Sequence, residues 1–507
     1  MTVPQELTVP ALAPSGTGTG PRGAGPSRAR LWLLRAAFAL PAAAFVVLMF
    51  LDVEPTVVGG AAIGLVLVLM LAKVPVAVCM TVPALLGLYA LHGTRAAENL
   101  LGSIVFDSAA QWTLSVLPMF VLMGLLLWKS GITSAIYTAA SHWLGWLPGG
   151  LGVATNVAGA GLSAVTGTSV GSTHALARNG IPEMLRRGYD RRLAVGSVAV
   201  ASLSGHLIPP GILMVVYAGI AQVPVGPQLL AGIGPGILIT VACCAMIVAL
   251  SVTRPALAGR DRSALARAEP EEPRPTWGDR WRSALAIWPM VALIGLVLGT
   301  MFLGVFTATE AGAAGALGAV LLTFWFRRGN RPLAAMGAAT AETVRSMGGI
   351  FFLLVGATAL SRLLSVSGLA DGFADWVAEL GLGRIGFLVL MIGAYLVMGT
   401  FLESLAMLLL TVPLLLPVLE SLDISPIWFG VFVVLLCEVG MLTPPVGILA
   451  FIIHGITKEP DVNGGQEISL GDIFRAITWF FPVILAVLFL LIAFPDIVGF
   501  VPAQMGE

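Results

Sequence analysis

Charged side chains are scarce in this chain of 507 residues: Asp, Glu, Lys and Arg together make up 11% of it, and their charges sum to zero. A soluble domain carries roughly a quarter charged residues, so this composition excludes an ordinary soluble protein. The balanced charge also argues against nucleic-acid binding, which would need a basic face. Cysteine is equally rare, and none of the four has metal-ligand spacing or predicts a structural disulfide: Cys79, Cys243, Cys244 and Cys437.

The sequence also lacks the signatures of common catalytic sites. It has no metal-ligand cluster, nucleophile elbow or phosphate-binding loop, so we expect no enzyme and no cofactor. An ion channel is a second alternative, but that class favours continuous pore-lining helices over the paired interruptions described below.

Apolar residues are abundant instead, at 57% of the chain. A spanning helix needs about 20 mostly apolar residues, and many windows qualify. We therefore predict an all-α polytopic membrane protein. The predicted spans are 31–51, 56–72, 74–92, 112–128, 193–220, 228–252, 285–303, 309–326, 347–366, 427–455 and 476–495.

Two further apolar regions, 150–185 and 383–420, do not fit single spans. Small or polar residues interrupt each near its centre, at 166–169 and at 399–404. Each region is also too short for two full crossings and a loop. We predict that both are re-entrant helical hairpins.

The same helix-breaking motif occurs twice, as GHLIPPG from Gly205 and as GMLTPPVG from Gly440 (205 + 235 = 440). With the same offset, Ser169 pairs with Ser404. Proline removes an amide donor and clashes with the preceding turn, so each Pro-Pro must break its helix, 193–220 or 427–455. At membrane depth, freed backbone groups are tolerated only against protein or a water-filled cavity. Paired breaks in two halves indicate the binding site of a transporter.

The distribution of basic residues predicts the orientation. Arginines and lysines before the first span, around 186–192, in 254–282 and at 327–331 fall on one side if 150–185 is a hairpin, and this side is then cytoplasmic. The first hairpin then enters from the cytoplasm and the second from outside, which makes the two repeats inverted in topology.

The chain accordingly divides into segments around two repeats. The predicted segments are a disordered cytoplasmic tail (1–30), an extra N-terminal transmembrane helix (31–55), the first inverted repeat (56–253), a cytoplasmic linker (254–284), the second inverted repeat (285–497) and a tail (498–507).

The tip of the first hairpin is rich in hydroxyls and glycines from Ser163 to Thr173. Small residues let membrane helices pack closely, which explains the glycines but not the hydroxyls. Hydroxyls together with carbonyls freed at the break before Pro209 would supply the oxygen ligands of a sodium ion. Free helix N-termini at a hairpin tip would suit a substrate carboxylate.

These motifs resemble the large membrane subunit of tripartite ATP-independent periplasmic (TRAP) transporters, of the DctM type. The resemblance covers roughly 56–495 and rests on AVTGTSVGSTHA at 164–175, GYD at 188–190, HLIPPGILMVVYA at 206–218, GVFTATEAGA at 304–313 and LTPPVG at 442–447. It implies sodium-driven uptake of organic anions, such as C4-dicarboxylates or sugar acids, across the bacterial inner membrane. It also implies an elevator-type movement of the hairpin-bearing domain.

The family's sodium sites, carried over by motif, fall on two groups of residues. One group is Ser163, Thr166, Gly205, Ile208 and Pro209; the other is Gly399, Gly440, Thr443 and Val446. The hairpin tips add tentative substrate-binding residues: Thr168, Ser169, Thr400 and Ser404. The chain departs from the family in having Thr166 and Thr168 where serines are usual, which preserves the oxygens, and FTATEA where FTPTEA is usual.

The resemblance also implies partners: a DctQ-type small membrane subunit and a DctP-type extracytoplasmic substrate-binding protein. The extra first helix is too short to be a fused small subunit, so we expect that subunit to be a separate protein. A self-sufficient sodium–organic-anion symporter of related hairpin design is the alternative.

Four ionisable residues lie in apolar segments, and each has more than one possible role. Glu310 has the spacing of a capping box with Thr307. Glu403 either attracts cations or is an exposed tip carboxylate, and Glu438 and His206 either contact solute or have a buried partner.

Overall fold

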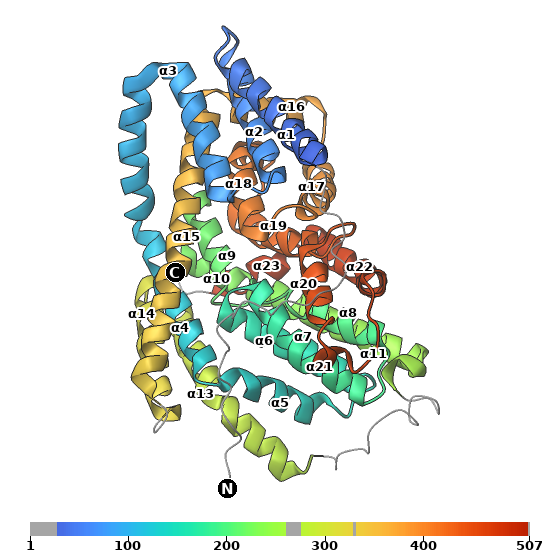
Figure 1. Ribbon diagram of the computed structural model, residues 1–507. Helices are drawn as coiled ribbons and strands as arrows, with labels where there is room; N and C mark the ends of the chain where they lie inside the picture. Colours follow the sequence, from blue (N-terminus) through green and yellow to red (C-terminus); the bar gives the residue numbers. More distant parts are fainter. Residues whose placement is uncertain (1–27, 260–274, 328–330, 505–507) are drawn as a thin grey trace.

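The computed structural model describes residues 28–259, 275–327 and 331–504, and over these ranges the chain consists of helices joined by turns and short loops (Figure 1). The predicted all-α class is confirmed. The predicted tail 1–30 falls largely outside the described residues, and so does the middle of the predicted linker 254–284, at 260–274.

Within the described residues, eight helices are long and apolar enough to cross a membrane, and a ninth span is obtained if α16 (Leu369–Glu379) and α17 (Arg384–Gly399), bent by 118°, are counted together. The family and these helices agree with a multi-pass membrane protein. The helices outside the predicted hairpins and broken helices include α1 (Arg28–Met49), α2 (Pro55–Leu71), α3 (Val76–Ala109), α4 (Val116–Lys129), α5 (Ile132–Leu144), α11 (Ile233–Thr253), α13 (Trp277–Phe302), α14 (Ala308–Phe326), α15 (Pro332–Val366) and α22 (Leu470–Ala493).

The two regions predicted to be hairpins each fold as two helices around a tight connection. The first contains α6 (Gly150–Thr166) and α7 (Ser169–Arg186), and the second contains α17 and α18 (Ser404–Ser421). The second helices match at both ends with the sequence offset, since 169 + 235 = 404 and 186 + 235 = 421. The internal repeat of the sequence is therefore also a repeat of helices.

Each predicted broken helix is interrupted at its Pro-Pro pair. The first is α8 (Arg191–Ala201) followed by α9 (Ile212–Ala221), and the second is α19 (Pro426–Gly440) followed by α20 (Ile448–Ile456). Both Pro-Pro peptide bonds are cis. The residues between the half-helices fold into turns that pair part of the freed backbone, for example the amide of Leu207 with the carbonyl of Ser204 at 3.1 Å.

The hairpins and broken helices form a common core. Within it, α6 packs against α7 and α8, α18 packs against α19 and α17 against α19, while α18 also contacts α9 of the first repeat. The core residues of α8, α9 and α19 are almost fully buried. The two repeats therefore meet at the breaks.

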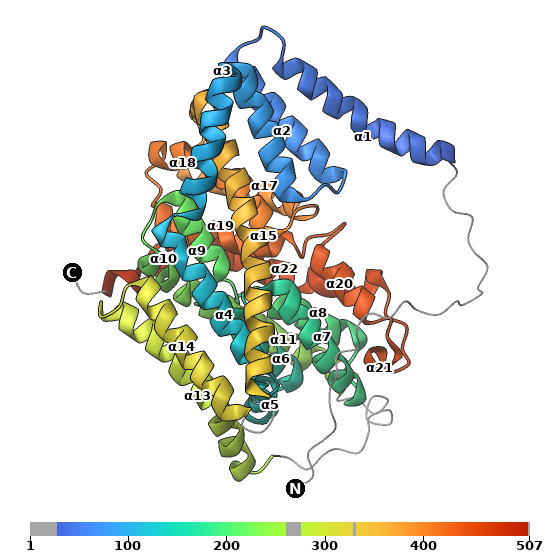
Figure 2. The same cartoon turned by 60° about the vertical axis from the view of Figure 1, so that its left-hand side comes forward.

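A second group of helices runs along one side of this core. The 35-residue α15 extends beside α3 and α4, and α14 packs on α4 (Figure 2). The predicted span 347–366 is thus the second part of a longer continuous helix. Likewise, α3 continues far beyond the predicted span 74–92, through a kink where Gly93 has a φ of 74°.

Helix capping explains why α13 begins inside the region predicted as linker. Thr276 and Asp279 form a capping box, which satisfies backbone amides at the helix start and allows the helix to begin at Trp277, before its apolar stretch. A corresponding box joins Thr307 and Glu310 at the start of α14. The predicted capping role of Glu310 is therefore confirmed.

Candidate functional site

The tip of the first hairpin is a two-residue connection. Gly167 follows α6 in the left-handed region, with φ 65°, where glycine is favoured, and its amide donates to the carbonyl of Ser163 at 2.8 Å. Thr168 is extended and Ser169 begins α7. The first backbone amides of α7 therefore have no hydrogen-bond partner within the helix. The residues that carry them line a cavity at the centre of the core.

Each hairpin tip touches the break of its own repeat. A Cβ atom at Gly205 would lie 1.8 Å from the Cβ atom of Ser163, so the two backbones meet at a distance that only glycine permits. In the second repeat, a Cβ atom at Gly399 would lie 2.3 Å from the Cα atom of Gly440. The predicted pairs Ser163–Gly205 and Gly399–Gly440 are thus brought together.

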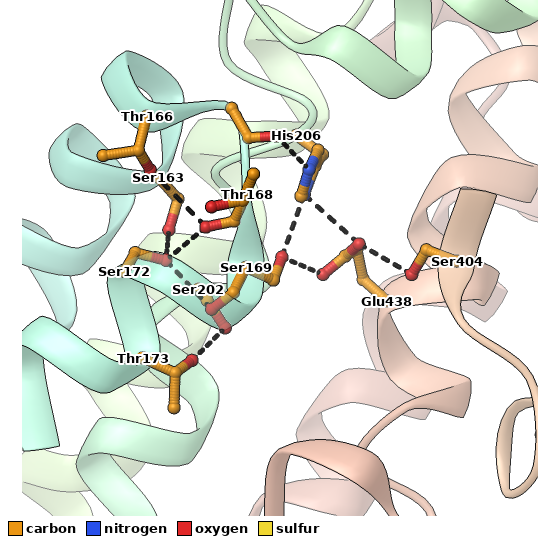
Figure 3. Close-up of polar contacts among 11 residues, drawn as sticks. Ser163, Thr166, Thr168, Ser169, Ser172, Thr173, Ser202, His206, Ser404 and Glu438 are labelled. Carbon is orange, nitrogen blue, oxygen red and sulfur yellow. Dashed lines mark hydrogen bonds and ion pairs between the residues drawn. The ribbon is translucent and has the colours of Figure 1, made fainter. Parts of the chain in front are cut away.

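A buried polar network lies between the two tips (Figure 3). The Glu438 carboxylate accepts hydrogen bonds from the Ser169 hydroxyl at 2.5 Å and from the Ser404 hydroxyl at 2.9 Å. His206 Nδ1 lies 3.2 Å from Glu438 Oε1 and 2.9 Å from the Ser169 hydroxyl. Its Nε2 lies 3.0 Å from the carbonyl oxygen of Gly167. Since a carbonyl oxygen can only accept, Nε2 is the donor of this hydrogen bond.

Further hydroxyls join this network within the first hairpin. Ser163 donates to the Ser172 hydroxyl at 2.5 Å, and Ser172 donates to the carbonyls of Thr168 and Ser169. Ser163, Ser169 and Ser172 are all buried. The hydroxyl-rich run therefore forms a connected polar path beneath the tip.

A cavity of about 420 Å³ opens beside the network. It is bounded by both tips, by the breaks and by the middle of α15; its polar lining residues are Thr168, Ser169, His206, Ser346, Glu403, Ser404 and Glu438. A neighbouring cavity of about 200 Å³ is lined by Thr166, Thr168, Glu342 and Ser346, among others. Among the residues that line these two cavities, all of them described, none is lysine or arginine.

Comparison with known proteins identifies the family. The model of the DctM component of tripartite ATP-independent periplasmic transporters matches residues 63–497. The chain belongs to this family.

Its relatives include permeases with different named substrates. The permease is 29% identical to the C4-dicarboxylate TRAP transporter large permease protein of Pseudomonas aeruginosa, over 79% of this chain and 86% of that protein. It is also 29% identical to the sialic acid TRAP transporter large permease protein of Vibrio cholerae, over 77% of this chain and 88% of that protein.

The fold is similar to that of a solved transporter. The YdaH transporter of Alcanivorax borkumensis superposes with a TM-score of 0.57 at 16% identity, covering 80% of the permease and 90% of that chain. At this identity the likeness concerns the fold alone.

The other residues of the predicted sodium sites lie at the two breaks and are described by their packing and hydrogen bonds. The side chain of Ile208 packs toward Gly236 of α11, where a Cβ atom would lie 2.7 Å away. Pro209 is buried and Val446 is half-buried. The Thr443 hydroxyl donates to the carbonyl of Val439 at 3.0 Å.

The tentative substrate residues separate into two kinds. Thr168, Ser169 and Ser404 line the large cavity, whereas the Thr400 hydroxyl donates back to the carbonyl of Val397 at 2.7 Å. Thr166 makes one long contact, from its hydroxyl to the carbonyl of Thr168 at 3.4 Å. Its hydroxyl is therefore weakly engaged within the protein.

Sequence reasoning missed the pairing of His206 with Glu438. Each had been recognised as an ionisable residue beside a break, but the side chains come from different repeats and their contact depends on how the repeats pack. One signal was available. Ser169 and Ser404 occupy equivalent positions in the two repeats, which is visible in the sequence. A side chain that bonds to both serines, as Glu438 does, must lie between the two tips.

Proposed function

We propose that this TRAP large permease imports organic anions, carboxylates such as C4-dicarboxylates or sugar acids, by sodium-coupled secondary transport. The observation that carries the proposal is the tip-to-break contact in both repeats, at Ser163–Gly205 and at Gly399–Gly440, beside a cavity whose lining includes hydroxyls from both tips. A break frees carbonyl oxygens, and a tip adds hydroxyls and helix N-termini. This combination suits the binding of a cation and a carboxylate close together.

The proposal includes two sodium sites. In the first, the hydroxyls of Ser163 and Thr166 and the carbonyls at Gly205, Ile208 and Pro209 would act as ligands. In the second, Gly399, Gly440 and Val446 would contribute carbonyls, and Thr443 would contribute its hydroxyl or carbonyl. Neutral oxygens suit a monovalent cation because they bind it without burying a net negative charge.

The carboxylate of the substrate would bind in the large cavity, beside the Glu438 network and facing the N-termini of α7 and α18. Both helices have 18 residues, and both begin at the large cavity with a serine, Ser169 or Ser404. Unpaired amides and the helix dipole favour an anion at such an end. With no lysine or arginine in the cavity lining, bound sodium would supply the positive charge that the anion needs.

Transport would involve a relative movement of two parts of the permease. The cavity lies between the hairpin tips and α15, at Ser346 and Ile350. An elevator-type movement of the hairpins and broken helices along α15 and its neighbours would carry the cavity from one side of the inner membrane to the other. The N-terminus would lie in the cytoplasm.

The permease would work with a small membrane subunit and a substrate-binding protein outside the cytoplasmic membrane. Membership of a tripartite family supports this assignment. The binding protein would deliver the anion, so it would make the main choice of substrate.

Reconstitution into liposomes tests the proposal. Uptake of radiolabelled succinate or sialic acid would be measured with the permease alone, and with a DctQ-type small subunit and a DctP-type binding protein added, under an inward sodium or potassium gradient. We expect uptake only with all three proteins and sodium. Uptake by the permease alone would support a self-sufficient symporter, and uptake driven equally by potassium would refute sodium coupling.

A further inference from the structure

The network between the tips departs from the repeat symmetry of the chain. The two serines are equivalent, since 169 + 235 = 404, but His206 corresponds to Met441 (206 + 235 = 441) and Glu438 corresponds to Leu203 (438 − 235 = 203). One histidine from the first repeat and one carboxylate from the second therefore serve both tips.

Glu438 holds the tips at a set spacing. Its two oxygens accept from Ser169 and Ser404 at 2.5 Å and 2.9 Å, so both bonds form only when the starts of α7 and α18 stand on either side of the carboxylate. The side chain of Glu438 is fully buried and that of His206 is 7% exposed. Buried polar groups without partners are costly, so the network favours this one arrangement of the tips.

His206 extends the network to the first predicted sodium site. Its Nε2 bonds the carbonyl of Gly167, the residue after Thr166, and its backbone directly follows Gly205, which packs on Ser163. A shift of the first tip therefore moves the partners of His206.

Glu438 reaches the second predicted sodium site in the same way. It lies on α19 two residues before Gly440, which packs on Gly399 at the second tip. A continuous set of bonded and packed groups thus links the two sites.

We propose that His206 and Glu438 are positioning residues that make the two sodium sites bind cooperatively, because each site is complete only when the shared network sets both tips. The proposal rests on the proposed sodium-coupled function. Neither side chain needs to touch sodium or substrate.

The test is a sodium titration of uptake by the complete reconstituted transporter. One variant is His206→Met, which installs the residue found at the equivalent position 441. The other is Glu438→Gln, which replaces one of the two acceptor oxygens by an NH2 group, so that one serine loses the oxygen to which it donates. Each should lower the Hill coefficient for sodium from about 2 toward about 1 and raise the half-saturating sodium concentration about fivefold or more. The double variant should be little worse than either single one, because both remove the same link.

Thr173→Val is the matched control. Its hydroxyl is buried in the same hairpin and donates to Ser202 at 3.2 Å, outside the network, so its Hill coefficient should match that of the unmodified transporter. Equal Hill coefficients in His206→Met, Glu438→Gln and the unmodified transporter would overturn the proposal, as would an equal loss in Thr173→Val.

A binding measurement covers variants that do not transport. Sodium chloride should raise the melting temperature of the detergent-solubilised complex with a sigmoidal concentration dependence, relative to potassium chloride, and the variants should show a hyperbolic one. A sigmoidal dependence retained in both variants would overturn the proposal. If the unmodified transporter shows no response to sodium by either method, the proposed function itself fails.

Discussion

At the scale of single residues, contact distances identify the positions of the site at which a larger side chain would not fit. Gly205 and Gly399 each meet the opposing backbone at a distance that excludes a side chain. Ser163 and Thr166, three residues apart at the same tip, differ in another way: the first hydroxyl has a short hydrogen bond, and the second is weakly engaged. Substitutions at these positions therefore test packing and ion binding separately.

Gly205→Ala should destabilise the permease and abolish transport. The added methyl group would overlap Ser163, and overpacking of this kind costs about 1–3 kcal/mol. The measurement is thermal unfolding of the detergent-solubilised protein together with uptake. Gly295→Ala on α13 is the control, because nothing lies within 4 Å of its added Cβ atom. Normal uptake by Gly205→Ala would show that the tip and the break are not pressed together.

Thr166→Ala should weaken sodium activation while leaving the fold intact. The loss of one oxygen ligand to a charged ion costs about 1.5–3 kcal/mol, so the half-saturating sodium concentration should rise about tenfold or more. Thr478→Ala on α22, an exposed threonine that bonds its own helix, is the control. An unchanged sodium titration curve would remove Thr166 from the site.

At the scale of the element, helix ends follow local capping chemistry more than hydropathy. The spans predicted at 285–303 and 74–92 are parts of longer helices, α13 and α3, because a helix continues past its apolar stretch wherever its backbone remains paired. The breaks in 193–220 and 427–455 were predicted correctly, since proline acts on its own backbone and needs no tertiary partner.

Thr307→Ala should lower the stability of the start of α14 by about 1 kcal/mol, because it removes the hydroxyl that caps the Glu310 amide. The melting temperature should fall, while the sodium concentration for half-maximal uptake should not change. Thr300→Ala, which removes a hydroxyl bonded within α13, provides the comparison. A changed sodium dependence in Thr307→Ala would mean that this cap also acts on the site.

At the scale of the whole molecule, the cavity belongs to two groups of helices. The tips and breaks form one wall, and α15 forms the other. Ion pairs tie the hairpin-bearing part together at Arg178–Glu459 and Arg192–Asp472, and another joins α4 to α15 at Lys129–Glu342. The elevator hypothesis requires the wall of tips and breaks to move relative to α15.

Cross-linking tests this movement. Cysteines placed at Gly171 on the first hairpin and Ser346 on α15, which line the same cavities, should be joined by a short bifunctional thiol reagent. Uptake should then stop, and cleavage of the reagent should restore it. The two single-cysteine variants, treated in the same way, control for the four native cysteines. Full uptake with the cross-link in place would contradict the elevator movement.

The sequence by itself determined the all-α membrane class, the family, the positions of both breaks and the candidate residues at each tip. These follow from composition, from hydropathy along the chain and from the backbone chemistry of proline and glycine, all of which act locally. The tertiary structure alone decided that α15 is continuous past the cavity and that His206 meets Glu438 between Ser169 and Ser404. That contact joins side chains 232 positions apart (438 − 206 = 232), and it exists only because the two repeats pack with their breaks together.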